Sequence, residues 1–200
     1  MSFLFDIETM GIESTSVVLS AAIINFDLDE VLPDELLNEK KMTEIYHDFF
    51  NRACFVKFDT KSQVLDGRLV TKSIVDWWAK QADIPRKLSV PPRATDLDPA
   101  RGMDVLKKYI DENGGNQQMF FARGSLDQMA IDSLAMSVGE KPLAMYNQWR
   151  DVRTAVDLLA ESGYGNGYCR VKHFNPEAHV IKHDPRHDCA YDIMMLLYHE

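Results

Sequence analysis

Three apolar segments in the N-terminal third of the chain predict three neighbouring strands. Residues 2–8 form an apolar run that ends in acidic side chains. Residues 17–26 are apolar with only weak alternation, which predicts a strand buried on both faces. Residues 53–59 alternate and predict a third strand, whereas the acidic stretch 27–45 predicts a loop or a short helix. Three adjacent strands with modest connections predict an antiparallel meander.

The pattern then changes to alternating helices and strands. A capping-box pattern from Ser73 to Asp76 predicts a helix that begins near Ser73, with the serine as its cap. Four prolines and several basic side chains predict a basic loop over residues 84–101. We expect helices at 102–113, 125–138, 154–161 and 185–198, and strands at 118–122 and 149–152. Strands first and alternation afterwards predict an α/β fold, a mixed sheet with helices on both faces.

Length and composition fit one domain that spans residues 1–200, because 46% of the residues are hydrophobic and can bury a core. No apolar run reaches the roughly 18 residues of a membrane span. The N-terminus lacks the basic segment of a secretory signal. Cys54, Cys169 and Cys189 are few, odd in number and far apart, which predicts reduced thiols in a cytoplasmic protein.

The net charge of −9 argues against a broad basic surface that wraps DNA. Nucleic-acid binding stays open, because some of the acidic residues could be metal ligands and bound cations would reverse the local charge. An acidic enzyme with a small substrate is the alternative that charge alone leaves.

Two acidic residues end the first predicted strand. Asp6 and Glu8 are two residues apart, so their side chains share one face of a strand. The apolar approach through Phe3, Leu4 and Phe5 predicts a central buried strand, in which unpaired carboxylates are costly without cations. The alternative is a solvated strand end.

Asp127 occupies the first turn of a predicted helix. Ser125 is its expected N-cap, and Gln128 completes a capping box. The preceding strand aims this turn at an edge of the sheet, where α/β proteins bind ligands. Stabilisation of the helix N-terminus by the Asp127 carboxylate is an equally good explanation of the sequence.

The last helix is predicted to begin at Pro185, with Asp184 as N-cap. His183 then lies in the preceding loop and Asp188 lies one turn inside the helix. We therefore predict His183 and Asp188 as a pair that faces the acidic residues of the other segments.

His187 and Asp192 form an alternative pair with the same five-residue spacing. Five residues turn a helix by about 140°, so two helical residues at this spacing do not share a face. We favour His183 with Asp188 and keep Asp192 as a reserve ligand. Four carboxylates that converge with a histidine predict a site for two divalent cations that cleaves phosphodiesters.

These segments resemble the three motifs of the DEDD superfamily of 3′→5′ exonucleases, in the histidine-containing (DEDDh, DnaQ-like) branch. Residues 6–9 (D-I-E-T) resemble the first motif, and Leu126 with Asp127 resembles the second. His183 with Asp188 resembles the third, although Pro185 stands where the superfamily often has Ala. Further stretches resemble the T-even phage exodeoxyribonuclease A type: residues 5–11, 58–63, 71–78, 150–154 and 187–190.

The resemblance implies a ribonuclease-H-like fold with a five-stranded mixed sheet, three antiparallel strands being followed by parallel ones. It implies that Asp6, Glu8, Asp127 and Asp188 hold two Mg²⁺ or Mn²⁺ ions and that His183 accepts or orients a proton. The implied activity releases nucleoside monophosphates from the 3′ end of single-stranded DNA. An exoribonuclease on the same scaffold is the close rival, and a nucleic-acid-binding adaptor without activity or a hydrolase for small phosphates are more distant ones.

Five residues are candidates for substrate contact. In the family that the chain resembles, the region of Thr9, Met10 and Gly11 grips the 3′ end. Trp77 could stack on an unpaired base, and Arg123 could contact phosphate.

Other candidates carry a structural explanation. Trp78 lies four residues after Ile74, which predicts a core stripe. Arg150 and Arg153 could contact phosphate, but pairing with Asp151 or Asp157 explains them equally well.

Overall fold

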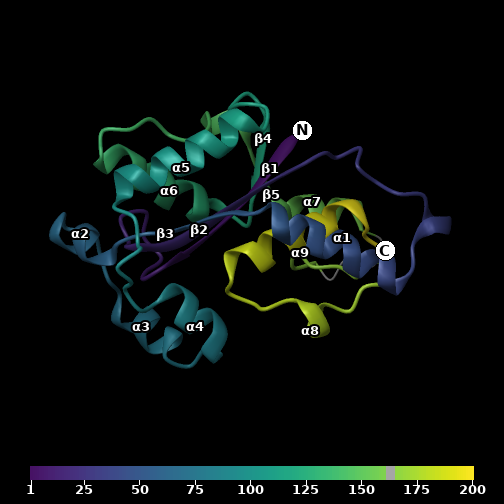
Figure 1. The fold of residues 1–200 in the computed structure, drawn as a ribbon, viewed down its shortest axis with the longest axis horizontal. Coiled ribbons are helices and arrows are strands. Elements are labelled where there is room, and N and C mark those ends of the chain that lie inside the picture. Colours follow the sequence, from purple (N-terminus) through teal and green to yellow (C-terminus); the bar gives the residue numbers. More distant parts are fainter. Residues whose placement is uncertain (161–164) are drawn as a thin grey trace.

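The structure, a computed structural model, describes residues 1–160 and 165–200. The described chain forms a sheet with the strand order β3-β2-β1-β4-β5 (Figure 1). The first three strands pair antiparallel and the last two pair parallel, as the sequence predicts for a ribonuclease-H-like sheet. The strands are β1 (Ser2–Thr9), β2 (Val18–Phe26), β3 (Cys54–Lys57), β4 (Met119–Ala122) and β5 (Trp149–Asp151).

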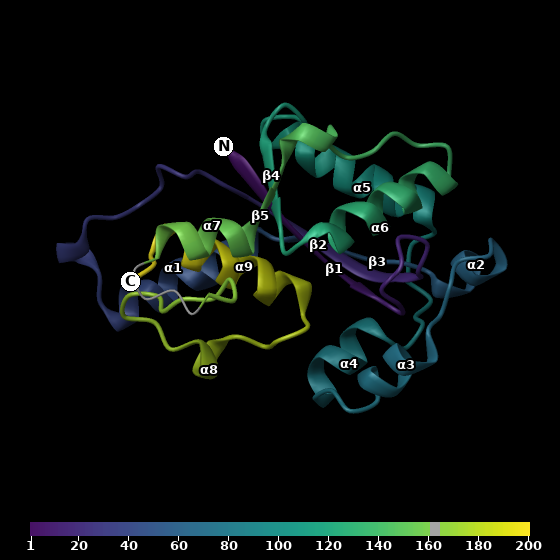
Figure 2. The same cartoon turned by 180° about the vertical axis from the view of Figure 1, so that it is seen from behind.

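Helices cover both faces of this sheet, which confirms the α/β fold (Figures 1 and 2). Helices α1, α7 and α9 lie on one side, and α5 and α6 lie on the other. The helices are α1 (Glu39–Arg52), α2 (Thr60–Leu65), α3 (Lys72–Trp78), α4 (Asp83–Ser89), α5 (Pro99–Glu112), α6 (Ser125–Ser137), α7 (Val152–Leu159), α8 (Pro176–His179) and α9 (Pro185–Leu197).

The central strand β1 divides the core into two layers. Phe3, Phe5 and Ile7 pack with α5 and α6, because alternate side chains of a strand point to opposite faces. Leu4 points to the other face and packs against α9. Asp6 continues the face of Leu4, so this carboxylate emerges beside the N-terminal half of α9.

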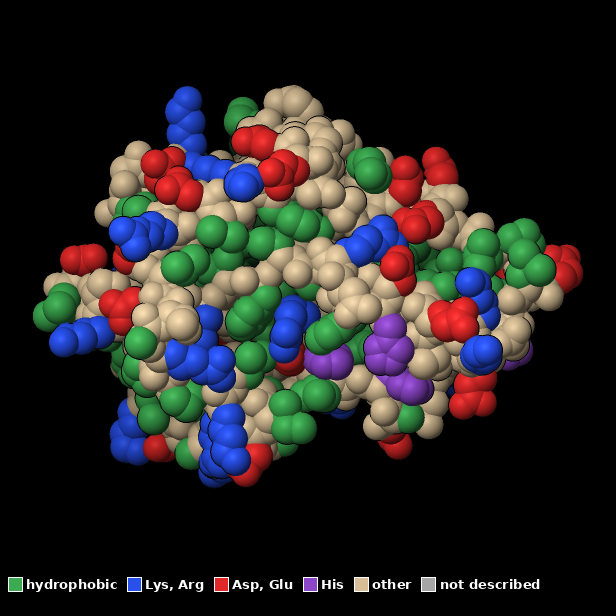
Figure 3. Space-filling model, viewed as in Figure 1, with side chains coloured by type: hydrophobic (Ala, Val, Ile, Leu, Met, Phe, Trp, Pro, Cys, Tyr) green, Lys and Arg blue, Asp and Glu red, His purple; other side chains and the backbone are tan. Residues whose placement is uncertain are grey.

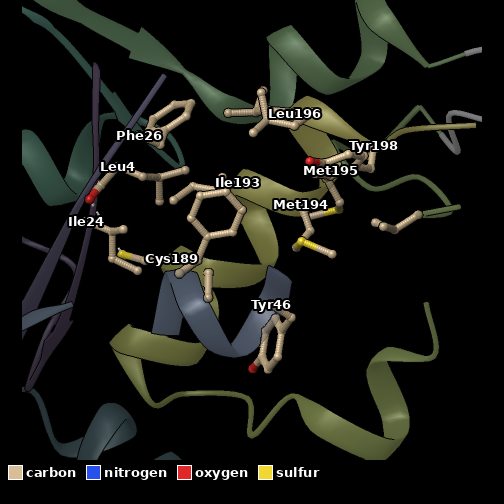
Figure 4. Packing of buried hydrophobic residues seen from close by; sticks show 14 of the residues in the cluster. Leu4, Ile24, Phe26, Tyr46, Cys189, Ile193, Met194, Met195, Leu196 and Tyr198 are labelled. Atoms are coloured by element: carbon tan, nitrogen blue, oxygen red, sulfur yellow. Dashed lines mark hydrogen bonds between the residues drawn. The ribbon is translucent and has the colours of Figure 1, made fainter. Parts of the chain in front are cut away.

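Helix α9 is buried along most of its length and anchors the second layer. Figure 4 shows Cys189 and Ile193 of this helix directed toward Leu4 and Ile24 of the sheet. The Cys189 thiol donates to the carbonyl oxygens of Leu4 and Ala22, at 3.8 and 3.6 Å. These contacts fix the start of α9 against β1 and β2, and the third motif lies at this start.

Three parts of the helical prediction were wrong. Residues 27–45 were expected as a loop or short helix, but α1 begins at Glu39, capped by Asn38, and continues to Arg52. The prolines of residues 84–101 do not exclude α4, because Pro85 lies in its first turn, where the backbone N–H groups need no helical partner. Helix α2 was not predicted at all.

Helix boundaries also differ from the predictions. Helix α3 begins at Lys72 after Thr71, and no side chain caps it, so Ser73 is not its cap. Gly124 precedes α6 with a φ of 80°, so the N-cap predicted at Ser125 is wrong as well. Helix α5 begins at Pro99, three residues before the predicted start. The N-cap role of Asp184 is confirmed by the bond that its side chain accepts from the Arg186 N–H.

The helix predicted at 154–161 corresponds to α7, and its predicted last residue, 161, lies outside the described residues. Within residues 1–160 and 165–200, no helix has the length and apolar character needed to cross a bilayer.

Candidate active site

The two acidic residues of the first motif lie near the end of the central strand. Asp6 pairs with Ala22 and Glu8 pairs with Ser20 in the antiparallel ladder with β2. The register shifts between Glu8 and Thr9, so the strand deviates directly after the second acid. Both carboxylates share the sheet face that α9 covers, and Glu8 is buried.

Asp127 approaches the same end of β1 from β4, the neighbour of β1 on the side opposite β2. It lies in the first turn of α6, which follows β4 after Arg123 and Gly124. Its side chain is buried, and burial raises its pKa to about 8, with Asp192 acting in the same direction. The helix N-terminus therefore does not explain Asp127 fully, because a capping carboxylate at a surface would not be buried among other acids.

The third motif completes the group from the start of α9. His183 precedes the helix with a left-handed backbone (φ 66°), and its N–H donates to the Asp188 carboxylate at 2.8 Å. The His183 Nδ1 atom lies 3.9 Å from the Glu8 Oε1 atom. Glu8, His183 and Asp188 each offer one ligand atom within 4.8 Å of the others.

His187 takes a different position. Its Nδ1 atom is hydrogen-bonded to the Tyr46 hydroxyl, and its ring lies 4.4 Å from the ring of Phe50. The side chain is buried against α1, away from Glu8 and Asp188. The structure therefore brings His183 to the acidic residues and leaves His187 in the core.

Burial and mutual repulsion dominate the electrostatics of the acidic group. The pKa of Asp6 is raised well above its ordinary value, first by burial and then by Asp127, Asp188 and Glu8. Burial and Asp188 likewise raise the pKa of Glu8, and burial raises that of Asp188 to about 7. Such shifts mean that the group as a whole resists full ionisation unless positive charge is added.

The residues present fit a divalent cation. The Asp6 Oδ2 atom is buried without a hydrogen-bond partner among the described residues. A buried carboxylate oxygen normally has a hydrogen bond or coordinates a metal. Carboxylate oxygens are also the ligands that Mg²⁺ and Mn²⁺ prefer.

The acidic group lines a cleft of about 1220 Å³. All five predicted catalytic residues border it: Asp6, Glu8, Asp127, His183 and Asp188. Asp192, the reserve ligand, also borders the cleft but is already paired with Arg123.

Arg123 has partners within the protein, so its contact with a phosphate stays a prediction. Its Nε atom donates to both carboxylate oxygens of Asp192 at 2.9 Å, and its Nη1 atom donates to the Gly167 carbonyl at 2.9 Å. Its guanidinium also lies over the Tyr168 ring, 4.0 Å from the centroid. A phosphate would have to displace these partners.

The segment after the first motif is held by its own bonds. The Met10 N–H donates to Val17 and its carbonyl accepts from Thr71, both at 2.8 Å. The Thr9 hydroxyl donates to the Gly11 carbonyl at 2.6 Å. Backbone contacts from Met10 to a nucleotide would break these bonds, so substrate binding by Thr9, Met10 and Gly11 remains a prediction.

The two neighbouring tryptophans divide as the sequence predicts. Trp78 is buried, and its Nε1 atom donates to the Thr9 carbonyl at 3.0 Å. Trp77 is 37% exposed, and its ring meets the His183 ring edge-on with centroids 4.8 Å apart. The freer indole therefore lies directly beside the predicted base.

Sequence reasoning gave little weight to one cationic residue of the cleft. Arg153 borders the cleft beside the acidic group. Neither periodicity nor motif spacing could show that its expected acidic partners are engaged elsewhere.

Comparison with known proteins agrees with this geometry. A family model described as "3'-5' exoribonuclease Rv2179c-like domain" matches residues 1–197. A relative named "Exodeoxyribonuclease" from Enterobacteria phage T4 is 27% identical over 225 residues, covering 98% of this chain and 87% of the phage protein. The protein therefore belongs to the family of Rv2179c-like 3′-5′ exonuclease domains, with the DnaQ-like fold that its motifs predict.

Proposed function

We propose that the protein is a metal-dependent 3′→5′ exonuclease that removes nucleoside monophosphates from single-stranded DNA. The observation that carries this proposal is the convergence of four carboxylates and one histidine from three remote segments in a single cleft. The buried, unpartnered Asp6 oxygen supports a cation at its centre.

Asp6, Glu8, Asp127 and Asp188 would hold two Mg²⁺ or Mn²⁺ ions. When bound, such ions supply charge neutralisation at the scissile phosphate and acidify a coordinated water. The carboxylates themselves set the negative charge that recruits the ions and fix where the phosphate docks.

His183 is assigned as the group that accepts a proton from the attacking water. Burial and the neighbouring Lys182 lower the pKa of His183 from its usual value. A neutral imidazole therefore prevails at pH 7, and only the neutral form can accept a proton. The edge of Trp77 restricts the ring on one side, and the bond from the His183 N–H to Asp188 fixes the backbone.

A polymeric substrate is supported by the surface beside the cleft. Lys and Arg side chains gather over α3 and α4 in Figure 3, where the outline of the molecule is notched toward α8. Arg86 and Lys87 of α4 and Arg93 after this helix are basic residues of the stretch 84–101, which the sequence predicted as a basic loop. Trp77, at the end of α3, would stack on a base of the strand.

DNA is favoured as substrate because the phage relative is named an exodeoxyribonuclease. The description of the family model as an exoribonuclease supports RNA as the second candidate. A protein distinguishes the two through the 2′-hydroxyl.

Two further observations support a cellular compartment and a domain organisation for the protein. Three free thiols, two of them buried, support a reducing, cytoplasmic compartment. The family match over residues 1–197 supports one exonuclease domain.

Digestion of end-labelled oligonucleotides tests the proposal. We expect 5′-labelled single-stranded DNA to shorten stepwise from its 3′ end in Mg²⁺ or Mn²⁺, and no cleavage in EDTA. Parallel RNA oligonucleotides of the same sequence decide between the two substrates. Degradation from the 5′ end, or activity that persists in EDTA, would contradict the mechanism.

A further inference from the structure

We infer that Arg153 binds a phosphate of the substrate strand next to the metal ligands, which is one of the two roles that the sequence left open for this residue. This inference rests on the proposed nuclease function and deepens it, because it names the cation that positions the strand.

Among the residues that the structure describes, the lysine and arginine side chains that border the active-site cleft are Arg123, Arg153, Arg170 and Lys182. The Arg123 guanidinium is bound to Asp192 and Gly167. Arg153 differs, because the residues that the structure describes give its guanidinium no hydrogen bond and no ion pair. An unpaired arginine at the border of an acidic cleft is available for an anionic ligand.

The acids that could have neutralised Arg153 have other partners. Asp151 caps α7 by accepting from the Thr154 N–H at 3.1 Å. Asp157 accepts from the Gly167 N–H at 3.0 Å. Pairing with either acid, the explanation that the sequence left open, is therefore not what the structure adopts.

Two glycines leave room for the Arg153 side chain. A Cβ atom on Gly167 would lie 2.4 Å from the Cβ and Cγ atoms of Arg153, too close for any other residue. A Cβ atom on Gly124 would lie 3.4 Å from its Nη1 atom. The stem therefore packs on one glycine while the guanidinium lies over the other, one turn before Asp127.

The position of the guanidinium determines which phosphate it can reach. Gly124 directly precedes α6, whose first turn carries Asp127. Arg153 borders the cleft together with Asp127 and Asp192, and its Nη1 atom lies against Gly124, so the guanidinium faces the acidic end of the cleft. A phosphate held there would be the scissile group or its immediate neighbour, and the planar guanidinium suits two of its oxygens.

Lys182 is a poorer choice for substitution in a test, because it adjoins His183 and lowers the pKa of that imidazole. Its replacement would alter the proton acceptor as well as the charge of the cleft. Arg153 is therefore the residue that a test can isolate.

The test compares Arg153→Gln and Arg153→Lys with the control Arg150→Gln. Arg150 is the second residue of β5 and is exposed, and among the described residues its Nη1 atom donates to the Asn147 and Trp149 carbonyls. The two Gln variants remove the same charge from the same segment. Thermal unfolding of all three should match the wild type, because both side chains are exposed.

For Arg153→Gln we expect the KM for a single-stranded oligonucleotide to rise about 10- to 100-fold, the range of one charge-assisted hydrogen-bonded contact. Arg153→Lys should recover part of this loss, and Arg150→Gln should stay within about 2-fold of the wild type.

Binding without metal supplies a readout that is independent of catalysis. We expect the slope of log K against log salt, measured in EDTA by fluorescence anisotropy, to fall by about 0.7 for Arg153→Gln, as for one lost phosphate contact on a single strand. Equal KM values and equal slopes for Arg153→Gln and Arg150→Gln would overturn the inference while leaving the nuclease function intact. A wild-type protein that cleaves no oligonucleotide would instead overturn the proposed function.

Discussion

His183 combines an unusual backbone with a site position. A non-glycine residue at a φ of 66° costs about 1–2 kcal/mol relative to an ordinary conformation. The N–H bond to Asp188 at 2.8 Å compensates for this cost and ties the histidine backbone to a metal-ligand candidate. With this backbone conformation, the imidazole of His183 lies beside Glu8.

The two histidines of the third motif should respond differently to substitution. We expect His183→Ala to lower kcat by about 10²- to 10⁴-fold, the usual loss for a general base, with little change in melting temperature. His187→Ala should leave kcat within a few fold but lower the stability by about 1–3 kcal/mol, because it removes a buried ring and leaves the Tyr46 hydroxyl with its long 3.4 Å bond to the His179 carbonyl. Steady-state kinetics and thermal unfolding of both variants measure this difference, and a larger kcat loss for His187→Ala would reverse the assignment.

Most of the acidic group could be predicted from the sequence because its geometry is local. The two-residue spacing of Asp6 and Glu8 fixes a common face, and Pro185 fixes where α9 begins. The partner of Arg123 could not be predicted in this way. Its pairing with Asp192, 69 residues later, depends on how α9 passes the end of β4, which is a property of the tertiary structure.

Helices were harder to predict where local signals point in opposite directions. The buried stripe of α1 (Met42, Tyr46 and Phe49) follows helical spacing, but many polar residues dilute it. Pro85 predicts a loop, yet in the first turn of α4 it removes no helical hydrogen bond. Strands β1 and β2 were found because their short apolar runs are rich in β-branched and aromatic residues, which favour strands over helices.

Helix α9 should be the element whose packing stabilises the fold most. Ile193 is fully buried between α9 and the sheet, so Ile193→Ala should lower the free energy of unfolding by about 2–5 kcal/mol. For a chain of this length, that corresponds to a melting temperature lower by roughly 5–15 °C. Leu158→Ala on α7 is the matched control, because Leu158 is 81% exposed and should change the stability by less than about 0.5 kcal/mol. Equal melting temperatures for the two variants would show that α9 is not packed as described.

The acidic site lowers the stability of the whole folded protein. Buried carboxyls with raised pKa values bind protons in the folded state that the unfolded chain has already released. Burial raises the pKa of Asp127 to about 8, that of Asp188 to about 7 and that of Asp192 to about 6. Between pH 4 and pH 8 the folded state therefore holds more protons, and the stability of the metal-free protein falls as the pH rises through this range.

Divalent cations should reverse this dependence, because they replace the protons and bind only the folded arrangement. We expect the melting temperature in EDTA to fall from pH 5 to pH 8 by at least about 3 °C, since one pKa unit corresponds to about 1.4 kcal/mol. The gain on adding Mn²⁺ should be larger at pH 8 than at pH 5. Asp6→Asn removes a carboxyl whose pKa is raised well above its ordinary value by burial and by the neighbouring acids, so it should raise the melting temperature in EDTA at pH 8, weaken the Mn²⁺ effect and abolish cleavage. Asp104→Asn, at an exposed position on α5, should change none of these quantities. A Mn²⁺ effect that is equal at both pH values, or unchanged in Asp6→Asn, would mean that the cations bind elsewhere, because only ligands that must lose protons couple metal binding to pH in this interval.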